Sequence, residues 1–279
     1  MHTNTFGMRL LEATQRHGRL CVGIDPHAQL LEQWGLGNTV EGLAEFSRRC
    51  VEAFAGHCAL VKPQVAFYEA FGAAGFAVLE ETISQLRAAG TLVLADAKRG
   101  DIGTTMKGYA TAWLDYSSPL CCDAVTCSPY LGFGSLKPIL EQAHSTGKGV
   151  FVLAATSNPE ARQLQDQRDA TGRSIAQQIV DDCAAENAAT GAPFGNVGVV
   201  VGATLDQPPA LDQLRGPILL PGVGAQGATA EDVNRICRGN EALAIPNISR
   251  AVLKHGPDVA ALRGALVQAS AEYPGISAL

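Results

Sequence analysis

Eight short apolar runs recur along this chain of 279 residues, and no other feature narrows the possible folds as far. Each run is rich in branched or small apolar residues, which is typical of parallel strands buried on both faces. The runs lie at residues 20–25, 59–65, 92–98, 124–128, 150–155, 197–203, 218–223 and 243–248. We therefore predict eight parallel strands.

Helical patterns lie between these runs. Apolar residues recur there every three or four positions, which is the spacing of one face of an α-helix. The patterned segments are 43–54, 76–86, 136–143, 175–183, 233–237 and 259–266, and the segments after the third and sixth runs are less regular. Thr229 and Asp232 have the spacing of a capping box and predict a helix start before residue 233.

Strands that alternate with helices along the chain predict an α/β fold. We expect a (β/α)8 TIM barrel formed as a single domain by residues 1–279, with residues 1–19 as an N-terminal extension. An open, doubly wound sheet is the alternative, but eight strands favour closure, and no glycine-rich dinucleotide fingerprint follows the first run. In such barrels the chemistry lies at the carboxyl ends of the strands. Polar residues do gather where the apolar runs end, at Asp25, Lys62, Asp96, Lys98, Ser128, Thr156, Ser157, Gln226 and Arg250.

The composition argues against several classes of protein. Acidic residues outnumber basic residues by 27 to 21, which is not the electrostatic footprint of a nucleic-acid-binding protein. No apolar run approaches the ~18 residues of a membrane-spanning helix, and residues 1–11 lack a secretory pattern. We expect a cytoplasmic protein that binds neither membranes nor nucleic acid.

The cysteines are expected to be small buried side chains. Cys21, Cys58, Cys127 and Cys183 lie within apolar segments, and no pair has C-x-x-C spacing. This arrangement favours neither disulfide bonds nor a metal site, in line with a reducing cytosol.

Charged residues end the third apolar run. The uninterrupted apolar part of this run, residues 92–95, is followed by Asp96, Lys98 and Asp101, and Gly100 allows the chain to turn before the last of them. Residues two apart in a strand project from the same face, so we expect Asp96 and Lys98 to lie together. A lysine between carboxylates stays protonated, because each anion favours the charged form. Such a lysine is suited to protonate a carbanion.

Lys62 and Asp25 end neighbouring strands and are expected to face the same barrel mouth, which is the opening at the carboxyl ends of the strands. Adjacent strands lie ~4.8 Å apart, so Lys62 can reach Asp96. Lys62, Asp96, Lys98 and Asp101 would then form an alternating network without net charge; the alternative is a purely structural ion-pair cluster. Asp25 precedes a proline and could be only a turn former. If it is functional, it could accept hydrogen bonds from sugar hydroxyls.

Two loops near the end of the chain have the character of a phosphate site. Gln226 lies in a glycine-rich loop after the seventh run, and glycines let backbone N–H groups approach an anion closely. Ser249 and Arg250 follow the eighth run and open a helix, whose N-terminus and arginine both favour phosphate. These loops are the usual phosphate site of TIM barrels.

The segment 157–174 after the fifth run is long and polar, so we predict an active-site lid. Ser157 at its start is a candidate for hydrogen bonding to a polar ring. The alternative for Ser157 is a capped turn.

Four motifs together are similar to those of a known family. They are I-D-P at Asp25, V-K-P at Lys62, D-x-K-x-x-D-I-x-x-T from Asp96 to Thr105 and P-G-V-G-A-Q-G around Gln226, with Ser249-Arg250 after them. In this order they resemble the orotidine 5′-phosphate decarboxylase family, in the branch that carries D-A-K-R-G-D-I-G. The resemblance runs from about residue 21 to residue 250, and the long loop and the N-terminal extension also fit this branch.

The resemblance implies conversion of orotidine 5′-monophosphate to uridine 5′-monophosphate and CO₂ in pyrimidine biosynthesis, with no metal or organic cofactor. It implies that Asp96 lies against the substrate carboxylate and that Lys98 protonates C6 as CO₂ leaves. Lys62 would hold the ribose and the charged network, and Asp25 would bind a ribose hydroxyl.

The resemblance also assigns the remaining candidates. Ser157 would contact the pyrimidine ring, and Gln226 and Arg250 would bind the phosphate. Asp101 and Thr105 would reach into the site of a neighbouring subunit, which implies a homodimer with shared sites.

Other functions stay open at this point. Mg²⁺-dependent keto-sugar-phosphate decarboxylases and hexulose-phosphate synthases share the D-x-K-x-x-D barrel, but they need a further carboxylate for the metal, and the second strand here supplies Lys62. A class I aldolase with Lys98 as Schiff-base former would need a neutral amine. A phosphate-ligand binding protein without turnover is the third alternative.

Overall fold

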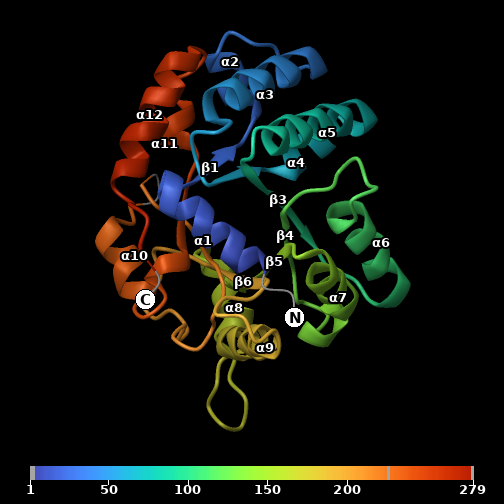
Figure 1. The fold of residues 1–279 in the computed structure, drawn as a ribbon, viewed down its shortest axis with the longest axis vertical. Coiled ribbons are helices and arrows are strands. Elements are labelled where there is room, and N and C mark those ends of the chain that lie inside the picture. Colours follow the sequence, from blue (N-terminus) through green and yellow to red (C-terminus); the bar gives the residue numbers. More distant parts are fainter. Residues whose placement is uncertain (1–3, 225–226, 278–279) are drawn as a thin grey trace.

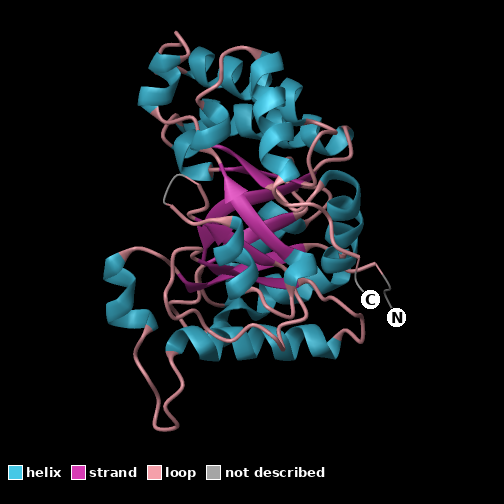
Figure 2. Cartoon of the chain, turned by 90° about the vertical axis from the view of Figure 1, so that its left-hand side faces the viewer, coloured by secondary structure: helices cyan, strands magenta, loops and turns pink. Residues whose placement is uncertain are grey.

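The computed structural model describes residues 4–224 and 227–277, in which eight parallel strands close into a barrel in chain order. Each predicted apolar run corresponds to one strand, with ends that differ by at most two residues, and the (β/α)8 barrel is confirmed. The strands occupy the centre of the molecule with helices around them (Figures 1 and 2). They are β1 (Cys21–Ile24), β2 (Leu60–Pro63), β3 (Leu92–Arg99), β4 (Ala124–Cys127), β5 (Gly149–Ala155), β6 (Val197–Val201), β7 (Ile218–Pro221) and β8 (Ala244–Ile248).

The predicted helical segments correspond to α3, α5, α7, α9, α10 and α12. The α-helices are α1 (Phe6–His17), α2 (Ala28–Gln33), α3 (Val40–Phe54), α4 (Val65–Glu69), α5 (Gly72–Ala88), α6 (Gly103–Leu114), α7 (Lys137–Thr146), α8 (Arg162–Gln165), α9 (Ile175–Ala189), α10 (Ala230–Ile236), α11 (Arg250–Leu253) and α12 (Val259–Ala271). The predicted capping box of Thr229 and Asp232 begins α10. No helix among the described residues is long and apolar enough to cross a membrane.

One unit of the barrel lacks its helix. The segment 202–217 between β6 and β7, which is described throughout, contains only turns and loop. Pro208 and Pro209 lie in its middle, and proline lacks the N–H group that a helix interior requires. Leu211 and Leu214 of this segment are buried, so the loop covers the barrel wall that a helix covers elsewhere.

The apolar core has two layers, because successive residues of a strand point to opposite sides. Val22 packs in the outer layer between strands and helices, whereas its neighbour Cys21 lies inside the barrel. Phe6 and Leu10 of α1 join this inner layer. A Cβ atom at Gly149, the first residue of β5, would lie 2.5 Å from the Phe6 ring. The predicted N-terminal extension therefore carries a helix that closes the amino end of the barrel.

Candidate active site

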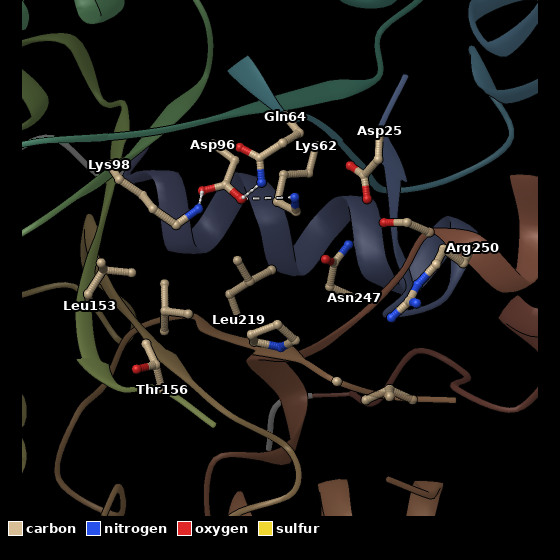
Figure 3. Close-up of a pocket in the computed structure, with 15 residues that line it drawn as sticks. Asp25, Lys62, Gln64, Asp96, Lys98, Leu153, Thr156, Leu219, Asn247 and Arg250 are labelled. Carbon is tan, nitrogen blue, oxygen red and sulfur yellow. Dashed lines mark hydrogen bonds and ion pairs between the residues drawn. The ribbon is translucent and has the colours of Figure 1, made fainter. Parts of the chain in front are cut away.

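A cavity of about 300 Å³ lies at the carboxyl ends of the strands (Figure 3). It is the place where the fold class predicts chemistry. Three cationic and two anionic side chains line it, which leaves a net charge of +1 in the cavity wall. Its lining comprises Asp25, Lys62, Gln64, Asp96, Lys98, Leu153, Thr156, Val200, Leu219, Pro221, Gly222, Val223, Asn247, Ser249 and Arg250.

The Asp96 carboxylate is the centre of the charged cluster. On Oδ2 it accepts hydrogen bonds from Lys62 Nζ at 3.0 Å and Gln64 Nε2 at 2.9 Å. On Oδ1 it accepts from Lys98 Nζ at 2.6 Å and Thr126 Oγ1 at 2.9 Å. Both carboxylate oxygens are thus held by donors from β2, from the residue that follows β2, from β3 and from β4. The predicted contact between Lys62 and Asp96 is present. The carboxylate is fixed in one orientation at the cavity wall.

The two buried members of this cluster hold each other in the charged state. Burial alone would raise the pKa of Asp96, but the nearby ammonium groups of Lys62 and Lys98 more than offset it, so that pKa lies below its ordinary value. Burial alone would lower the pKa of Lys62, but the carboxylates of Asp96 and Asp25 raise it above its ordinary value. The Lys62 and Asp96 side chains, 5% and 9% exposed, are therefore an ion pair at neutral pH.

Lys98 reaches Asp96 through an irregular backbone and not through the regular alternation that the sequence suggests. The register between β3 and β4 shifts between Ala95 and Arg99, and Lys98 has φ of +49°. This left-handed conformation is uncommon outside glycine and is found preferentially at functional sites. The Lys98 side chain remains 47% exposed, so its ammonium group is accessible from the cavity.

The structure does not bring Asp101 into this cluster. Its carboxylate accepts a hydrogen bond from the Ile102 backbone N–H at 2.7 Å, and it does not line the cavity. The chain passes tightly against the next loop at Gly100, where a Cβ atom would lie 2.4 Å from the Ser128 carbonyl oxygen, and it then leaves the mouth. Thr105 lies exposed on α6. The predicted four-member network thus has three members within one chain, and their net charge is +1 and not zero.

The opposite end of the cavity has a different character. Arg250 lies there, far from Lys98 in the view of Figure 3, and among the described residues it has no ion-pair partner. Ser249 directly precedes it and lines the same cavity. Gly222 and Gly224 of the adjacent loop have φ of +99° and +71°, a conformation that glycine adopts without strain. Gln226, the predicted phosphate ligand in this loop, lies outside the described residues.

Asp25 faces the cavity from the end of β1, as predicted. Its Oδ1 atom is buried, and no donor among the described residues reaches it. A buried acceptor of this kind costs free energy unless a hydrogen bond satisfies it. Asp25 is therefore suited to accept a hydrogen bond from a ligand hydroxyl.

Ser157 lies beside this cavity and not in it. It lines a neighbouring cavity of about 780 Å³ between the loops after β5 and β6, whereas the preceding Thr156 lines the site. The segment 157–174 first folds back, where Gln165 Oε1 accepts a hydrogen bond from the Thr156 backbone N–H at 2.8 Å. Between α8 and α9 it then projects from the barrel as the loop at the bottom of Figure 1. Its role as a lid stays a prediction.

Three polar residues of the site escaped the sequence analysis, namely Gln64, Thr126 and Asn247. Gln64 directly follows β2, and Thr126 and Asn247 lie within β4 and β8. The inward-facing Ala124 and Ile245 precede the latter two by two positions, so a period of two predicts that both face the barrel interior. This alternation of inward- and outward-facing residues along a strand was the signal by which Thr126 and Asn247 could have been found.

Comparison with known proteins agrees with this geometry. The Orotidine 5′-phosphate decarboxylase / HUMPS family matches residues 18–265. This chain belongs to that family. The family name includes HUMPS beside the decarboxylase, so individual relatives are needed to show which members this chain is similar to.

Relatives carry the name of the decarboxylase. An orotidine 5′-phosphate decarboxylase from Corynebacterium efficiens is 66% identical over 275 residues, covering 98% of both chains, and one from Corynebacterium glutamicum is 63% identical over 273 residues, covering 97% of this chain and 98% of the relative. A solved structure from Streptomyces avermitilis, provisionally assigned as orotidine 5′-phosphate decarboxylase, superposes with a TM-score of 0.93 at 51% identity, covering 98% of this chain and 95% of that one. The Leishmania donovani OMP decarboxylase structure has a TM-score of 0.73 at 32% identity, covering 95% and 98%.

Proposed function

We propose that this chain converts orotidine 5′-monophosphate to uridine 5′-monophosphate and CO₂ in pyrimidine biosynthesis, and that it does so in the cytoplasm. The observation that carries the proposal is the buried Asp96 carboxylate, held between Lys62 and Lys98 at the carboxyl ends of the strands. The two Corynebacterium decarboxylases support it, because they are 66% and 63% identical to this chain over nearly its full length.

The cluster supplies what this reaction requires. The bond between C6 and the carboxylate carbon breaks, CO₂ leaves, and the electron pair stays on C6, where it has little resonance relief. Placed charge has to stabilise this carbanion. Lys98 would stabilise it and transfer an N–H proton to C6, leaving a neutral amine that solvent reprotonates. Asp96 would lie against the substrate carboxylate, and Lys62 would keep Asp96 ionised.

The rest of the substrate would occupy the other end of the cavity. Arg250 and the loop of Gly222 would bind the phosphate, with Ser249 beside them, and Asp25 would accept a hydrogen bond from a ribose hydroxyl. Binding energy gained at a distant phosphate can bring the reacting carboxylate against Asp96. We further propose that Ser157 contacts the pyrimidine ring and Gln226 the phosphate when the segment 157–174 closes over the cavity as a lid.

We also propose a homodimer in which Asp101 and Thr105 of one copy complete the site of the other. The loop after β3 lies against the loop after β4, since Ser128 N–H donates to the Arg99 carbonyl at 2.8 Å. Ile102, Tyr130 and Leu131 on these loops are 62%, 76% and 54% exposed, which is typical of an interaction surface. Sedimentation equilibrium should give twice the chain mass of 29.1 kDa, and a monomer at micromolar concentration would contradict the dimer.

Turnover is tested directly by following the ultraviolet absorbance of orotidine 5′-monophosphate mixed with the purified protein. We expect the absorbance to change to that of uridine 5′-monophosphate at the same rate with and without EDTA. Loss of all turnover on chelation would favour the Mg²⁺-dependent alternative. Binding of the nucleotide without any absorbance change would favour a non-catalytic binding protein.

The phosphate assignment predicts a binding defect in Arg250→Ala. A hydrogen bond to a charged group contributes about 1.5–3 kcal/mol, so KM should rise by roughly 10- to 100-fold. The matched control is Arg16→Ala on α1, which removes a surface arginine whose side chain is 63% exposed, and KM should not change there. Steady-state kinetics measure both values, and an unchanged KM in Arg250→Ala would place the phosphate elsewhere.

A further inference from the structure

The strand that carries Asp96 and Lys98 has a bulge opposite one residue of its neighbour. Ala95 pairs with Val125 and Arg99 pairs with Cys127. The three residues of β3 between these pairs are therefore opposed by Thr126 alone. A bulge of this kind bends a strand and redirects its side chains, and bulges are frequent beside active sites. It removes the Lys98 backbone N–H from the regular ladder of main-chain hydrogen bonds.

The Thr126 side chain takes the place of the missing main-chain partner. Its Oγ1 accepts a hydrogen bond from the Lys98 backbone N–H at 2.9 Å and donates one to Asp96 Oδ1 at 2.9 Å. The same Oδ1 accepts from Lys98 Nζ at 2.6 Å. A hydroxyl has one hydrogen and accepts through its lone pairs, so both bonds can form together. Thr126 is 1% exposed, and solvent does not compete for them.

These bonds connect the main chain of Lys98 to the carboxylate that holds its ammonium group. We propose that Thr126 is a positioning residue for proton transfer: its hydroxyl holds Lys98 in the left-handed conformation that brings Nζ onto Asp96. This inference rests on the proposed decarboxylase function and names a residue that acts through Lys98 without touching the substrate. Without the hydroxyl, Lys98 would lose the hydrogen bond that stabilises φ of +49°, and Nζ would move away from C6.

The test compares Thr126→Val with Thr126→Ser. Misplacement of a reacting group by ~1 Å can cost ~10²-fold in rate, so kcat of Thr126→Val should fall by roughly 10- to 100-fold. KM should change by less than about twofold, because the residues assigned to ribose and phosphate are untouched. Thr126→Ser keeps the hydroxyl and should stay within about threefold of the wild-type kcat.

Thr82→Val is the matched control for loss of a buried threonine hydroxyl. Thr82 is 3% exposed on α5 and donates to the Val78 carbonyl at 2.7 Å, away from the cavity. Its kcat should equal that of the wild type. Thermal unfolding of all three variants shows whether each is folded at the assay temperature.

A second readout does not depend on turnover. Hydrogen exchange of the segment containing the Lys98 amide should become faster in Thr126→Val and stay unchanged in Thr82→Val and Thr126→Ser. If wild-type protein does not turn over orotidine 5′-monophosphate, the proposed function fails while exchange still tests the link between Thr126 and Lys98. A folded Thr126→Val with kcat within twofold of wild type overturns the inference, as does an equal loss of kcat in Thr82→Val.

Discussion

Lys98→Ala is expected to form no detectable uridine 5′-monophosphate while still binding this product. Proton transfer by a positioned side chain contributes ~10²–10⁴-fold to a rate, and in the proposed mechanism Lys98 also supplies charge next to the carbanion, so kcat should fall by at least ~10³-fold. Binding should persist because Arg250, Ser249 and Asp25 lie elsewhere in the cavity. The ultraviolet assay measures turnover, and isothermal titration calorimetry measures product binding.

The variant should also remain folded. The Lys98 side chain is half exposed, and Asp96 keeps its buried pair with Lys62 when Lys98 is absent. Lys137→Ala is the matched control, since that lysine is 77% exposed on α7 and its removal should leave kcat unchanged. Near-normal turnover in Lys98→Ala would refute Lys98 as the proton donor.

Asp96→Asn should lose both turnover and stability. Loss of one preorganised electrostatic group typically costs ~10²–10³-fold in kcat. The substitution also leaves Lys62 as a buried charge without its counter-ion, and breaking a buried ion pair in this way costs about 3–5 kcal/mol. Chemical denaturation measures the free energy of unfolding, and the assay measures kcat on the fraction that remains folded.

The stability effect of Asp96→Asn should depend on pH in a defined direction. The pKa of Asp96 is lowered in the folded state from an ordinary value of 3.8. Its stabilising contribution is therefore fully present above pH 3.8 and is lost as pH falls through the lower folded-state pKa. The difference between variant and wild type should be largest near neutral pH and shrink below pH 3.8.

The double variant Lys62→Met/Asp96→Asn separates the two effects. It removes the buried charge together with its partner, and replacing a whole buried pair is often close to neutral for stability. It should recover much of the unfolding free energy without recovering turnover. If Asp96→Asn were as stable as the wild type at pH 7, the prediction that the buried Lys62–Asp96 ion pair stabilises the fold would be contradicted.

Local patterns in the sequence were sufficient for the elements and for much of the site. The two periodicities, 2 for strands and 3.6 for helices, depend on neighbouring residues only, and all predicted runs and helical segments form the expected elements. Polar residues at strand ends meet because parallel strands end on the same side of a barrel. For this reason the sequence alone was sufficient to group six of the residues that line the cavity, namely Asp25, Lys62, Asp96, Lys98, Ser249 and Arg250.

Contacts between neighbouring strands were harder to predict. Thr126 and Gln64 reach Asp96 only through the pairing of β3 with the chain on either side of it, and pairing depends on register across the barrel. Asp101 was expected within the cluster because it is close in sequence. The tight passage of Gly100 against Ser128, a residue from another unit, directs the chain away from the mouth.

The sequence by itself determined the number of strands and their order along the chain, the end of the barrel at which the cavity lies, and the charged residues that line it. The tertiary structure alone decided how Lys98 faces Asp96, through a bulge opposite Thr126, and that the helix before β1 closes the barrel floor. The physical reason is that periodicity is a property of one segment, whereas bulges, register and closure arise from steric fit and hydrogen bonding between segments far apart in the chain.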